Sequence, residues 1–451
     1  MIPALSERTT YDRRLGLFDG SMLVIGGIIG AGIFLNPTIV AQRTGSAAAS
    51  LLVWGLGGVV ALIGAMCFGE LGARHPHAGG SYVYLREVFG PLPAFLYGWT
   101  YLVVVNSGGI AAVSVTFAGY FCRLFTLSDA LIRPSAVAAL VLLHIINYYG
   151  IRPGAITTNV FTILRLLALA ALIAAGLAAI SGSAAPVSPP SESATYGGGA
   201  TFALLGAALI PVLFTYGGWQ HSNHVAGEIR DPERNLPRAL LIGVATVVVF
   251  YMLANVAYLH ALGLEGLANS TAPAADTMTA VLGPFGGKLI AFGIMCSTFG
   301  FLSLVILAGP RIYQAMADDG VFFEKAARLH PRYRTPSGAI FVQAVWAVAL
   351  TLSGNYGQLL DYVVFGDWIF FGLTVATLFF YRRRGAPPEG ATSFVWGYPV
   401  TPALFVLVAA FAVVSSIASN PWNAAVGGAL IAAGIPIFFF WSSKAGRRGA
   451  D

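Results

Sequence analysis

Long apolar runs fill almost the whole chain of 451 residues, and short clusters of charged residues, proline and glycine separate them. Most of the runs reach the roughly 20 residues that a helix needs to cross the hydrocarbon core of a bilayer. Twelve runs can be marked, at about 16–42, 46–72, 90–122, 134–150, 154–181, 201–226, 237–262, 285–316, 338–354, 358–381, 400–418 and 422–442. The pattern predicts an all-α polytopic membrane protein with 12 transmembrane helices.

Composition narrows the class of protein further. Hydrophobic residues make up 57% of the chain and charged residues 10%, whereas soluble domains are about 45–50% apolar and about 25% charged. This balance excludes a soluble enzyme and a disordered chain. Paired cysteines, His-x-x-x-His and phosphate-binding loops are missing from the sequence, so we expect no enzyme, no cofactor and no bound metal.

The basic residues indicate how the helices are oriented. If the N-terminus is cytoplasmic, 20 of the 25 Lys and Arg residues fall in cytoplasmic segments, four fall outside, and Arg165 lies within the fifth run. Excess Lys and Arg mark cytoplasmic loops. Topology thus accounts for the net charge of +6, and no nucleic-acid partner is expected. We expect a multi-pass protein of a cell (inner) membrane of bacterial type, with cytoplasmic termini at 1–15 and 443–451.

A loop rich in Ser, Pro, Ala and Gly, at about 181–199, separates the first five runs from the others. Transporters often repeat a unit of helices, and an odd number of helices per unit inverts the second copy. The sequence predicts a LeuT-like 5+5 inverted repeat with copies at 16–181 and 201–381, followed by helices 11 and 12 at 400–442.

Glycine clusters occur in the first helix of each predicted copy, within 26–34 and 214–220. Glycine in a helix interior costs about 1 kcal/mol relative to alanine, and close packing between helices is the alternative use of such residues. The two clusters occupy equivalent positions in the two predicted copies, and this favours breaks in helices 1 and 6. The ends of the half-helices could bind the carboxylate and the ammonium group of an amino acid.

Several motifs resemble a known family. They are 26–34, Phe68-Gly69-Glu70-Leu71-Gly72-Ala73-Arg74, 78–82, 161–167, the segment 214–238, 255–258 and 311–320. Together these motifs are similar to those of amino acid–polyamine–organocation (APC) superfamily permeases, and most similar to L-type amino acid transporters and their bacterial homologues. The resemblance spans about 16–340.

The resemblance implies a substrate site at the two clusters. Ile28, Ile29, Gly30, Ala31 and Gly32 would hold the substrate carboxylate, the carbonyls near Phe214, Thr215, Tyr216 and Gly217 would take the amino group, and the Phe214 ring would close over it. Two positions depart from the L-type pattern. Ala31 replaces a frequent serine, and Gln220 replaces a frequent asparagine, so the role of Gln220 stays open.

Two charged residues lie within apolar runs. Arg165 is deep in the fifth run, where an unpaired charge costs at least about 2.5–3.5 kcal/mol. In several members of the resembled family a lysine matches this position, and sodium-coupled relatives bind the sodium ion at the same place. Arg165 would tie helix 5 to helix 1, or would be a structural arginine bonded to carbonyls elsewhere. Glu70 would be a partner of Arg74 or a proton relay.

We therefore expect a sodium-independent exchanger or facilitator of neutral L-amino acids that works by alternating access. An arginine is not a proton carrier, and neither glycine cluster holds an acid or a base. The alternatives are a proton-coupled symporter and an exchanger of cationic amino acids or polyamines. If Arg165 faces the site, a transporter of acidic amino acids is a further alternative. A membrane sensor or enzyme is disfavoured.

Cys122 precedes a loop without the cysteine that links animal relatives to a heavy chain, so we expect no heavy-chain partner and a monomer or weak homo-oligomer.

Overall fold

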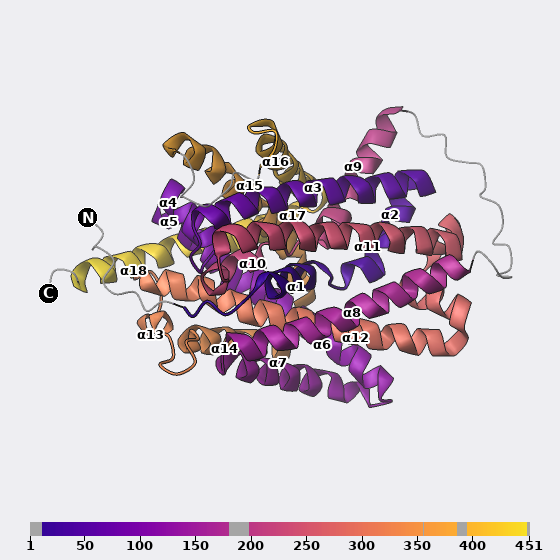
Figure 1. The fold of residues 1–451 in the computed structure, drawn as a ribbon, viewed down its shortest axis with the longest axis horizontal. Helices are drawn as coiled ribbons and strands as arrows, with labels where there is room; N and C mark the ends of the chain where they lie inside the picture. Colours follow the sequence, from indigo (N-terminus) through magenta and orange to yellow (C-terminus); the bar gives the residue numbers. More distant parts are fainter. Residues whose placement is uncertain (1–10, 180–197, 355, 386–394, 449–451) are drawn as a thin grey trace.

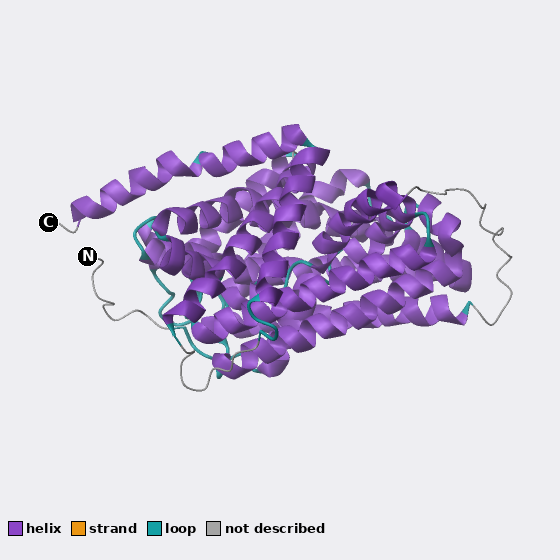
Figure 2. Ribbon diagram, turned by 90° about the horizontal axis from the view of Figure 1, so that it is seen from above, coloured by secondary structure: helices purple, strands orange, loops and turns teal. Residues whose placement is uncertain are grey.

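The computed structural model describes residues 11–179, 198–354, 356–385 and 395–448. Within these ranges the chain is built from helices and loops, with one isolated β-bridge between Leu15 and Ile229 (Figure 2). Residues 1–10, 449–451 and most of the predicted 181–199 loop lie outside the described part.

The helices follow one another along the chain with short connections. Their bounds are α1 Leu17–Ile28, α2 Gly32–Thr44, α3 Ala47–Arg74, α4 Ser81–Phe89, α5 Pro91–Thr100, the π-helix η1 Tyr101–Asn106, α6 Ser107–Leu124, η2 Asp129–Leu131, α7 Ile132–Tyr148, α8 Ile151–Ala178, α9 Gly198–Tyr216, α10 His221–His224, η3 Ala226–Glu228, α11 Pro232–Asn269, α12 Pro273–Asp318, α13 Glu324–Ala327, α14 Ser337–Ser353, α15 Tyr356–Arg384, α16 Val400–Ser419, α17 Pro421–Ala432 and α18 Gly434–Arg448.

Eight helical segments in the described residues are long and apolar enough to cross a membrane. A ninth span results if α1 and α2, bent by 44° at their junction, are taken together. The prediction of a multi-pass helical membrane protein is therefore confirmed. The predicted number of 12 spans stays a prediction, because α14 has only 17 residues and parts of α9 and α15 are not described at the level of side chains.

Local sequence explains where several helices end or bend. Gly45 adopts the left-handed conformation after α2, and Ser46 caps α3 by accepting a hydrogen bond from the Ala49 N–H. Gly263 and Gly283, both with positive φ, bend α11 and α12. These glycines permit backbone angles that other residues adopt only with strain.

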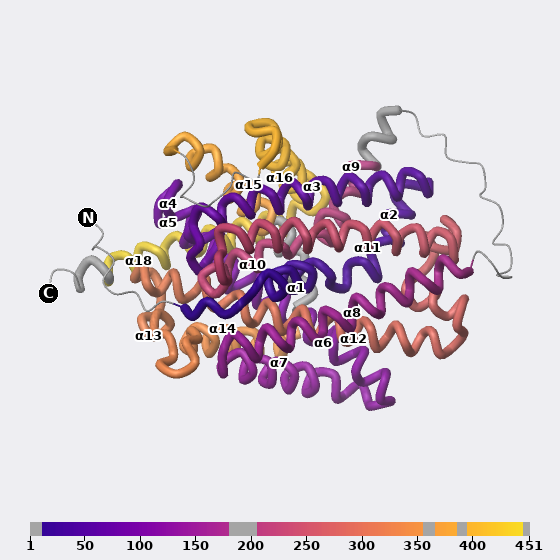
Figure 3. The backbone as a smooth tube through the Cα atoms, viewed as in Figure 1, coloured from indigo at the N-terminus to yellow at the C-terminus, as the bar shows by residue number. Residues whose placement is uncertain are grey.

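Two interrupted helices run through the centre of the bundle in opposite directions (Figures 1 and 3). The chain passes from α1 to α2, and from α9 to α10, and α1 packs against α10 while α2 packs against α9. Around them α12 lies along α8 and α11 lies along α3. In Figure 1, α13 and α18 lie at the left end of the molecule, called here the α18 end.

Candidate functional site

The first interruption separates α1 from α2 over three residues. Helix α1 ends at Ile28, Ile29 leaves the helical conformation with φ −74° and ψ 89°, and α2 begins at Gly32. The Gly30 N–H donates to the Ile28 carbonyl at 2.8 Å, which closes a tight turn. The sequence prediction of a break at these glycines agrees with this geometry.

The second interruption separates α9 from α10. Helix α9 ends at Tyr216, and Gly218 has a φ of +118°, a value that strains residues with a Cβ atom. The Gln220 side-chain oxygen accepts a hydrogen bond from the Gly218 N–H at 2.9 Å. Gln220 thus binds the backbone of the break itself, and in this state its carboxamide oxygen faces the chain and not an open space.

The two interruptions touch each other through their glycines. A Cβ atom added at Gly27 would overlap the Gly218 carbonyl oxygen, and one added at Gly218 would overlap the Gly27 carbonyl oxygen. The backbones of the two central helices are therefore in direct contact, and only glycine fits at both positions.

Arg165 of α8 lies beside the first interruption. Its Nη1 donates to the carbonyl oxygens of Gly26 at 2.7 Å and Ile29 at 2.6 Å. The side chain is 0% exposed, and its Nη2 has no hydrogen-bond partner among the described residues. Arg165 therefore places a buried cation at the C-terminal end of α1, where the helix dipole and the freed carbonyls favour positive charge.

Two further side chains satisfy the carbonyls of this break, and sequence reasoning missed the first of them, Tyr251. The Tyr251 hydroxyl of α11 donates to the Ile28 carbonyl at 3.1 Å, and the Ser297 hydroxyl of α12 donates to the Ile29 carbonyl at 3.3 Å. A lone tyrosine in a long apolar run is a weak signal, because such residues often pack as core. Only the fold shows that it reaches the broken helix.

The hydroxyl of Thr215 is engaged between the two broken helices. It donates to the Pro211 carbonyl at 2.6 Å and accepts from the Asn36 amide at 2.6 Å. A Cβ atom at Gly32 would meet the Thr215 side chain at 2.8 Å, so Gly32 permits the close approach of α2 to α9. The structure thus brings Gly32 and Thr215 together, and Asn36 is a contact that the sequence did not reveal.

Open space lies beside Gly30. A Cβ atom added there meets no atom within 4 Å, and Gly30, Ala31 and Gly32 are half-buried in a segment that is otherwise buried. The first N–H groups of α2 have no partner within their helix, and Ala31 provides no side-chain cap. Phe214 is 44% exposed. The free N–H groups at the start of α2 therefore offer hydrogen-bond donors to a carboxylate.

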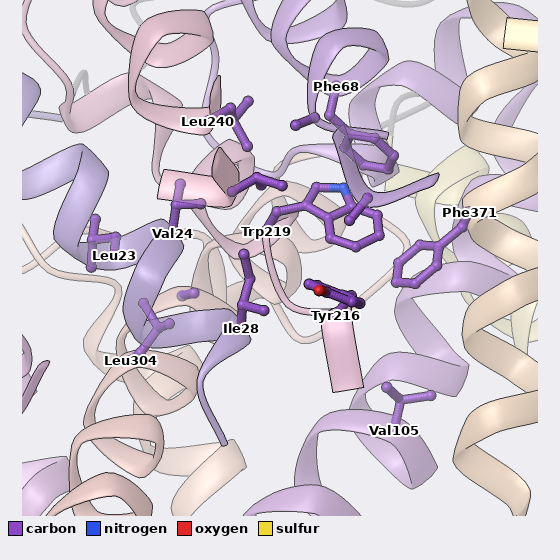
Figure 4. Close-up of a cluster of buried hydrophobic side chains, with 14 of the residues drawn as sticks. Leu23, Val24, Ile28, Phe68, Val105, Tyr216, Trp219, Leu240, Leu304 and Phe371 are labelled. Carbon is purple, nitrogen blue, oxygen red and sulfur yellow. The ribbon is translucent and has the colours of Figure 1, made fainter. Parts of the chain in front are cut away.

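An aromatic cluster packs around the residues that flank the second interruption. The Trp219 indole packs against Phe68 and Phe371, at ring-centroid distances of 6.5 and 5.8 Å, and Tyr216 lies nearby (Figure 4). Trp219 and Tyr216 are each 1% exposed. The side chains on both sides of Gly218 are therefore held in a packed core, which keeps the break in place.

At the α18 end, polar contacts join the first and second halves of the chain. The Glu228 carboxylate binds the Arg311 guanidinium at 2.9 and 3.1 Å, and both side chains are nearly unexposed. The Glu228 carbonyl accepts from the N–H groups of Arg14 and Leu15, at 2.9 Å each. These contacts join the segment before α1, η3 and α12, an arrangement called closed here.

Glu70, the other charged residue singled out from the sequence, belongs to a second ion-pair cluster. Its carboxylate is 0% exposed and contacts Arg74 at 3.1 Å, and Arg382 at 2.7 Å. The Val395 N–H also donates to it, at 3.3 Å. The described contacts of Glu70 are therefore those of an ion-pair cluster with Arg74 and Arg382, and they include no residue of the two glycine interruptions.

The architecture defines a class: a polytopic helical membrane protein in which two interrupted helices of opposite direction meet through their backbones, with a buried cation at one break. This is the arrangement in which secondary transporters bind their substrates.

The comparisons with known proteins name the family. The sequence model described as "Amino acid permease" matches residues 15–441, so the chain belongs to the amino acid permease family. It is 32% identical to the serine/threonine exchanger SteT of Bacillus subtilis (strain 168), covering 96% of this chain and 98% of that protein. Identity is 30% to the human b(0,+)-type amino acid transporter 1, over 96% of this chain and 89% of that protein. It is 31% to the human Asc-type amino acid transporter 1, over 98% of this chain and 85% of that one. The expectations of an APC amino acid transporter and not an enzyme are confirmed.

Proposed function

We propose that the protein is a sodium-independent exchanger or facilitator of neutral L-amino acids. The observation that carries the proposal is the contact of Gly27 with Gly218 beside the Arg165 guanidinium. It supports a substrate site at the junction of the two interrupted helices, with the ends of their half-helices available to the charged groups of an amino acid.

In this proposal Gly30, Ala31 and Gly32 line the carboxylate site, and the N–H groups of Ala31 and Gly32 donate to the substrate carboxylate, because the Gly30 N–H already donates to the Ile28 carbonyl. The open space beside Gly30 and the unpaired first turn of α2 support this role. Carbonyls at Phe214, Thr215 and Tyr216 take the ammonium group, and the half-exposed Phe214 ring closes over the substrate. Ile28, Ile29, Gly217 and Gln220 shape the backbone around it.

Preference for a neutral side chain follows from the charges around the two breaks. Arg165 is 0% exposed, its Nη1 donates to the Gly26 and Ile29 carbonyls, and its Nη2 lies against Gly300 of α12, so the guanidinium would have to move before it could pair with an acidic substrate. The buried Glu70 is bound by arginines and is not available to a cationic substrate. Sodium independence follows because Arg165 puts a fixed cation where a sodium ion would otherwise neutralise the freed carbonyls.

We further propose 12 membrane spans in a 5+5 inverted repeat, with copies at 16–181 and 201–381 and helices 11–12 at 400–442. The antiparallel pairing of α1 with α10 and α2 with α9 supports this repeat. Placement in an inner membrane with cytoplasmic termini rests on the distribution of Lys and Arg. The protein would work without a heavy chain, as a monomer or weak homo-oligomer.

The test uses purified protein in liposomes, with or without unlabelled amino acids inside. Uptake of labelled serine, alanine and leucine is followed in sodium and in sodium-free buffer, with lysine, putrescine and glutamate as competitors. We expect the rate of uptake to be the same with and without sodium. We also expect unlabelled neutral amino acids to inhibit it by competition. Uptake into empty vesicles that an imposed pH gradient drives would contradict exchange and support proton coupling. Competition by lysine or putrescine alone would support the cationic alternative.

A further inference from the structure

Two buried histidines occupy the short helix α10, which follows directly on the second interruption. His221 is 6% exposed and His224 is 0% exposed, and their rings lie 5.5 Å apart. Neither histidine belongs to the substrate site proposed above. Buried polar side chains within a membrane protein are costly and commonly serve the transport pathway.

Each histidine shares one hydrogen bond with a buried tyrosine. His221 Nδ1 lies 3.2 Å from the Tyr101 hydroxyl, and His224 Nε2 lies 3.2 Å from the Tyr97 hydroxyl. The second nitrogen of the His224 ring, Nδ1, is buried and has no partner in the part of the chain that the structure describes. In either tautomer the neutral ring can gain one proton and keep its contact with Tyr97, because the Tyr97 hydroxyl can either donate or accept.

The helix that supplies one of these tyrosines is itself irregular. Tyr101 begins η1, a π-helical segment that ends at Asn106. Such segments are uncommon and occur frequently at functional sites. The Asn106 amide donates to Tyr313 at 3.2 Å and to Gln343 at 2.9 Å, so the polar network continues into α12 and α14.

In the described residues, the carboxylates of η3 and α3 are bound to arginines, Asp19 of α1 is bound by the Asn159 amide, and none of these contacts involves His221 or His224. Glu228 of η3 is paired with Arg311 of α12, and Glu70 of α3 is paired with Arg74 and Arg382. In α15, Asp367 is within electrostatic reach of Tyr97 and Tyr101.

The remaining titratable neighbours are tyrosines on α4, α5, η1 and α12: Tyr84, Tyr97, Tyr101 and Tyr313. In the closed arrangement an imidazolium would therefore lack a contacting carboxylate in the described network. A charge without such a partner is costly in a dry interior, so closure favours the neutral histidines.

From this geometry we infer that the pair of His221 and His224 is a proton-binding site that opposes closure of the α18 end. The inference rests on the proposed alternating access, in which α1 and α10 move to open that end. Opening would bring water to the two rings, and a proton would bind there. The pair would have to release that proton before α10 could return to its dry contacts with Tyr97 and Tyr101.

The rate of exchange would then fall as the medium becomes acidic. A histidine in water titrates near pH 6.5, so the neutral fraction falls about tenfold between pH 7.5 and 5.5. If closing needs both rings neutral, exchange by the wild-type protein falls by at least about this factor over the same range. The profile is the opposite of the acid-stimulated uptake expected of a proton symporter.

The test measures amino acid exchange in liposomes at equal internal and external pH, from 5.5 to 7.5. The variant His221→Asn with His224→Gln keeps an acceptor and a donor near the positions of Nδ1 and Nε2 but does not titrate. We expect its exchange to be almost independent of pH. The control is His144→Asn in α7, because His144 is also buried, with Nδ1 on the Leu140 carbonyl and Nε2 unpartnered. This control should keep the wild-type profile.

A second measurement separates this inference from the proposed function. Thermal unfolding in detergent, at the same pH values, requires no transport. Because the folded state buries neutral histidines, their stabilisation is present at pH 7.5 and is lost on acidification. The unfolding midpoint should fall more in the wild type than in the double variant. If that variant does not fold, each single variant should lose part of the difference.

Equal pH dependence of the wild type and the double variant, in exchange or in unfolding, would overturn the proton site. Complete absence of exchange by folded wild-type protein at every pH would instead contradict the proposed function, and the unfolding data would still decide on the histidines.

Discussion

Gly27 of α1 and Gly218 after α9 lie backbone to backbone, each in the place that a Cβ atom on the other would need. The two residues are 191 positions apart in the sequence and come from the two predicted repeats. Their contact lets two interrupted helices approach as closely as peptide groups allow. A larger residue at either position would separate the two breaks.

The first prediction concerns Gly218→Ala. A Cβ atom at φ +118° strains the backbone, and it would also overlap the Gly27 carbonyl. Strain alone costs about 1–2 kcal/mol, and each 1.4 kcal/mol is a factor of about ten in rate or affinity. We expect exchange in liposomes to fall at least about tenfold.

Gly109→Ala is the matched control, since Gly109 is helical and a Cβ atom there meets nothing within 4 Å. It should transport as the wild type does. Full exchange by the Gly218→Ala variant would show that the close approach of the two breaks is not needed.

The second prediction concerns Gly30→Ala, which should separate binding from folding. The added methyl group meets no protein atom within 4 Å, so the unfolding midpoint should stay near that of the wild type. If the space beside Gly30 holds the substrate carboxylate, the methyl group takes part of that space. KM for exchange should rise several-fold, as measured by initial rates over a range of substrate concentrations. An unchanged KM would move the carboxylate site away from Gly30.

Sequence reasoning located the two breaks because glycine clusters in apolar helices are visible without a structure. It also singled out Arg165, since a charge deep in an apolar run is costly wherever it points. The partner atoms were not predictable. That Nη1 binds the Gly26 and Ile29 carbonyls depends on how α8 is rotated against α1.

The residues that sequence reasoning missed are of types that packing also uses. Tyr251 reaches the Ile28 carbonyl of the first break only because α11 passes beside it. His221 and His224 drew no attention because their spacing matches no familiar metal site, and their partners Tyr97 and Tyr101 come from a helix 120 or more positions earlier. Such long-range pairs follow from tertiary packing and not from local pattern.

The third prediction concerns Arg165→Met. The change removes the cation and leaves two buried carbonyls without that donor, at about 1–3 kcal/mol each, but it also removes a desolvated charge. These effects offset each other, so the unfolding midpoint should change little. Exchange should fall at least about tenfold, because the end of α1 loses its fixed charge. Arg165→Lys should retain part of the activity, since an ammonium group keeps the charge.

Arg152→Met is the control on the same helix. Arg152 is an exposed residue in the first turn of α8, so its loss should leave exchange unchanged. Equal exchange by the wild type and the Arg165→Met variant would identify Arg165 as a residue without a role in transport. Exchange that becomes dependent on sodium in that variant would support the view that the guanidinium stands in for an ion.

The fourth prediction decides between two roles of Glu70. Removing its charge by Glu70→Gln leaves Arg74 and Arg382 without the carboxylate that both contact, and losing one partner of a buried ion pair costs roughly 3–5 kcal/mol. Partial exposure of Arg382 reduces that cost. We expect a lower unfolding midpoint, with the remaining exchange following the wild-type dependence on pH.

Asp12→Asn, which removes an exposed ion pair with Arg14, should change neither property. A relay would behave differently: the Glu70→Gln variant would fold normally and lose the pH dependence. Because two arginines and the Val395 N–H all stabilise the charged carboxylate in one buried cluster, the structure favours the first outcome.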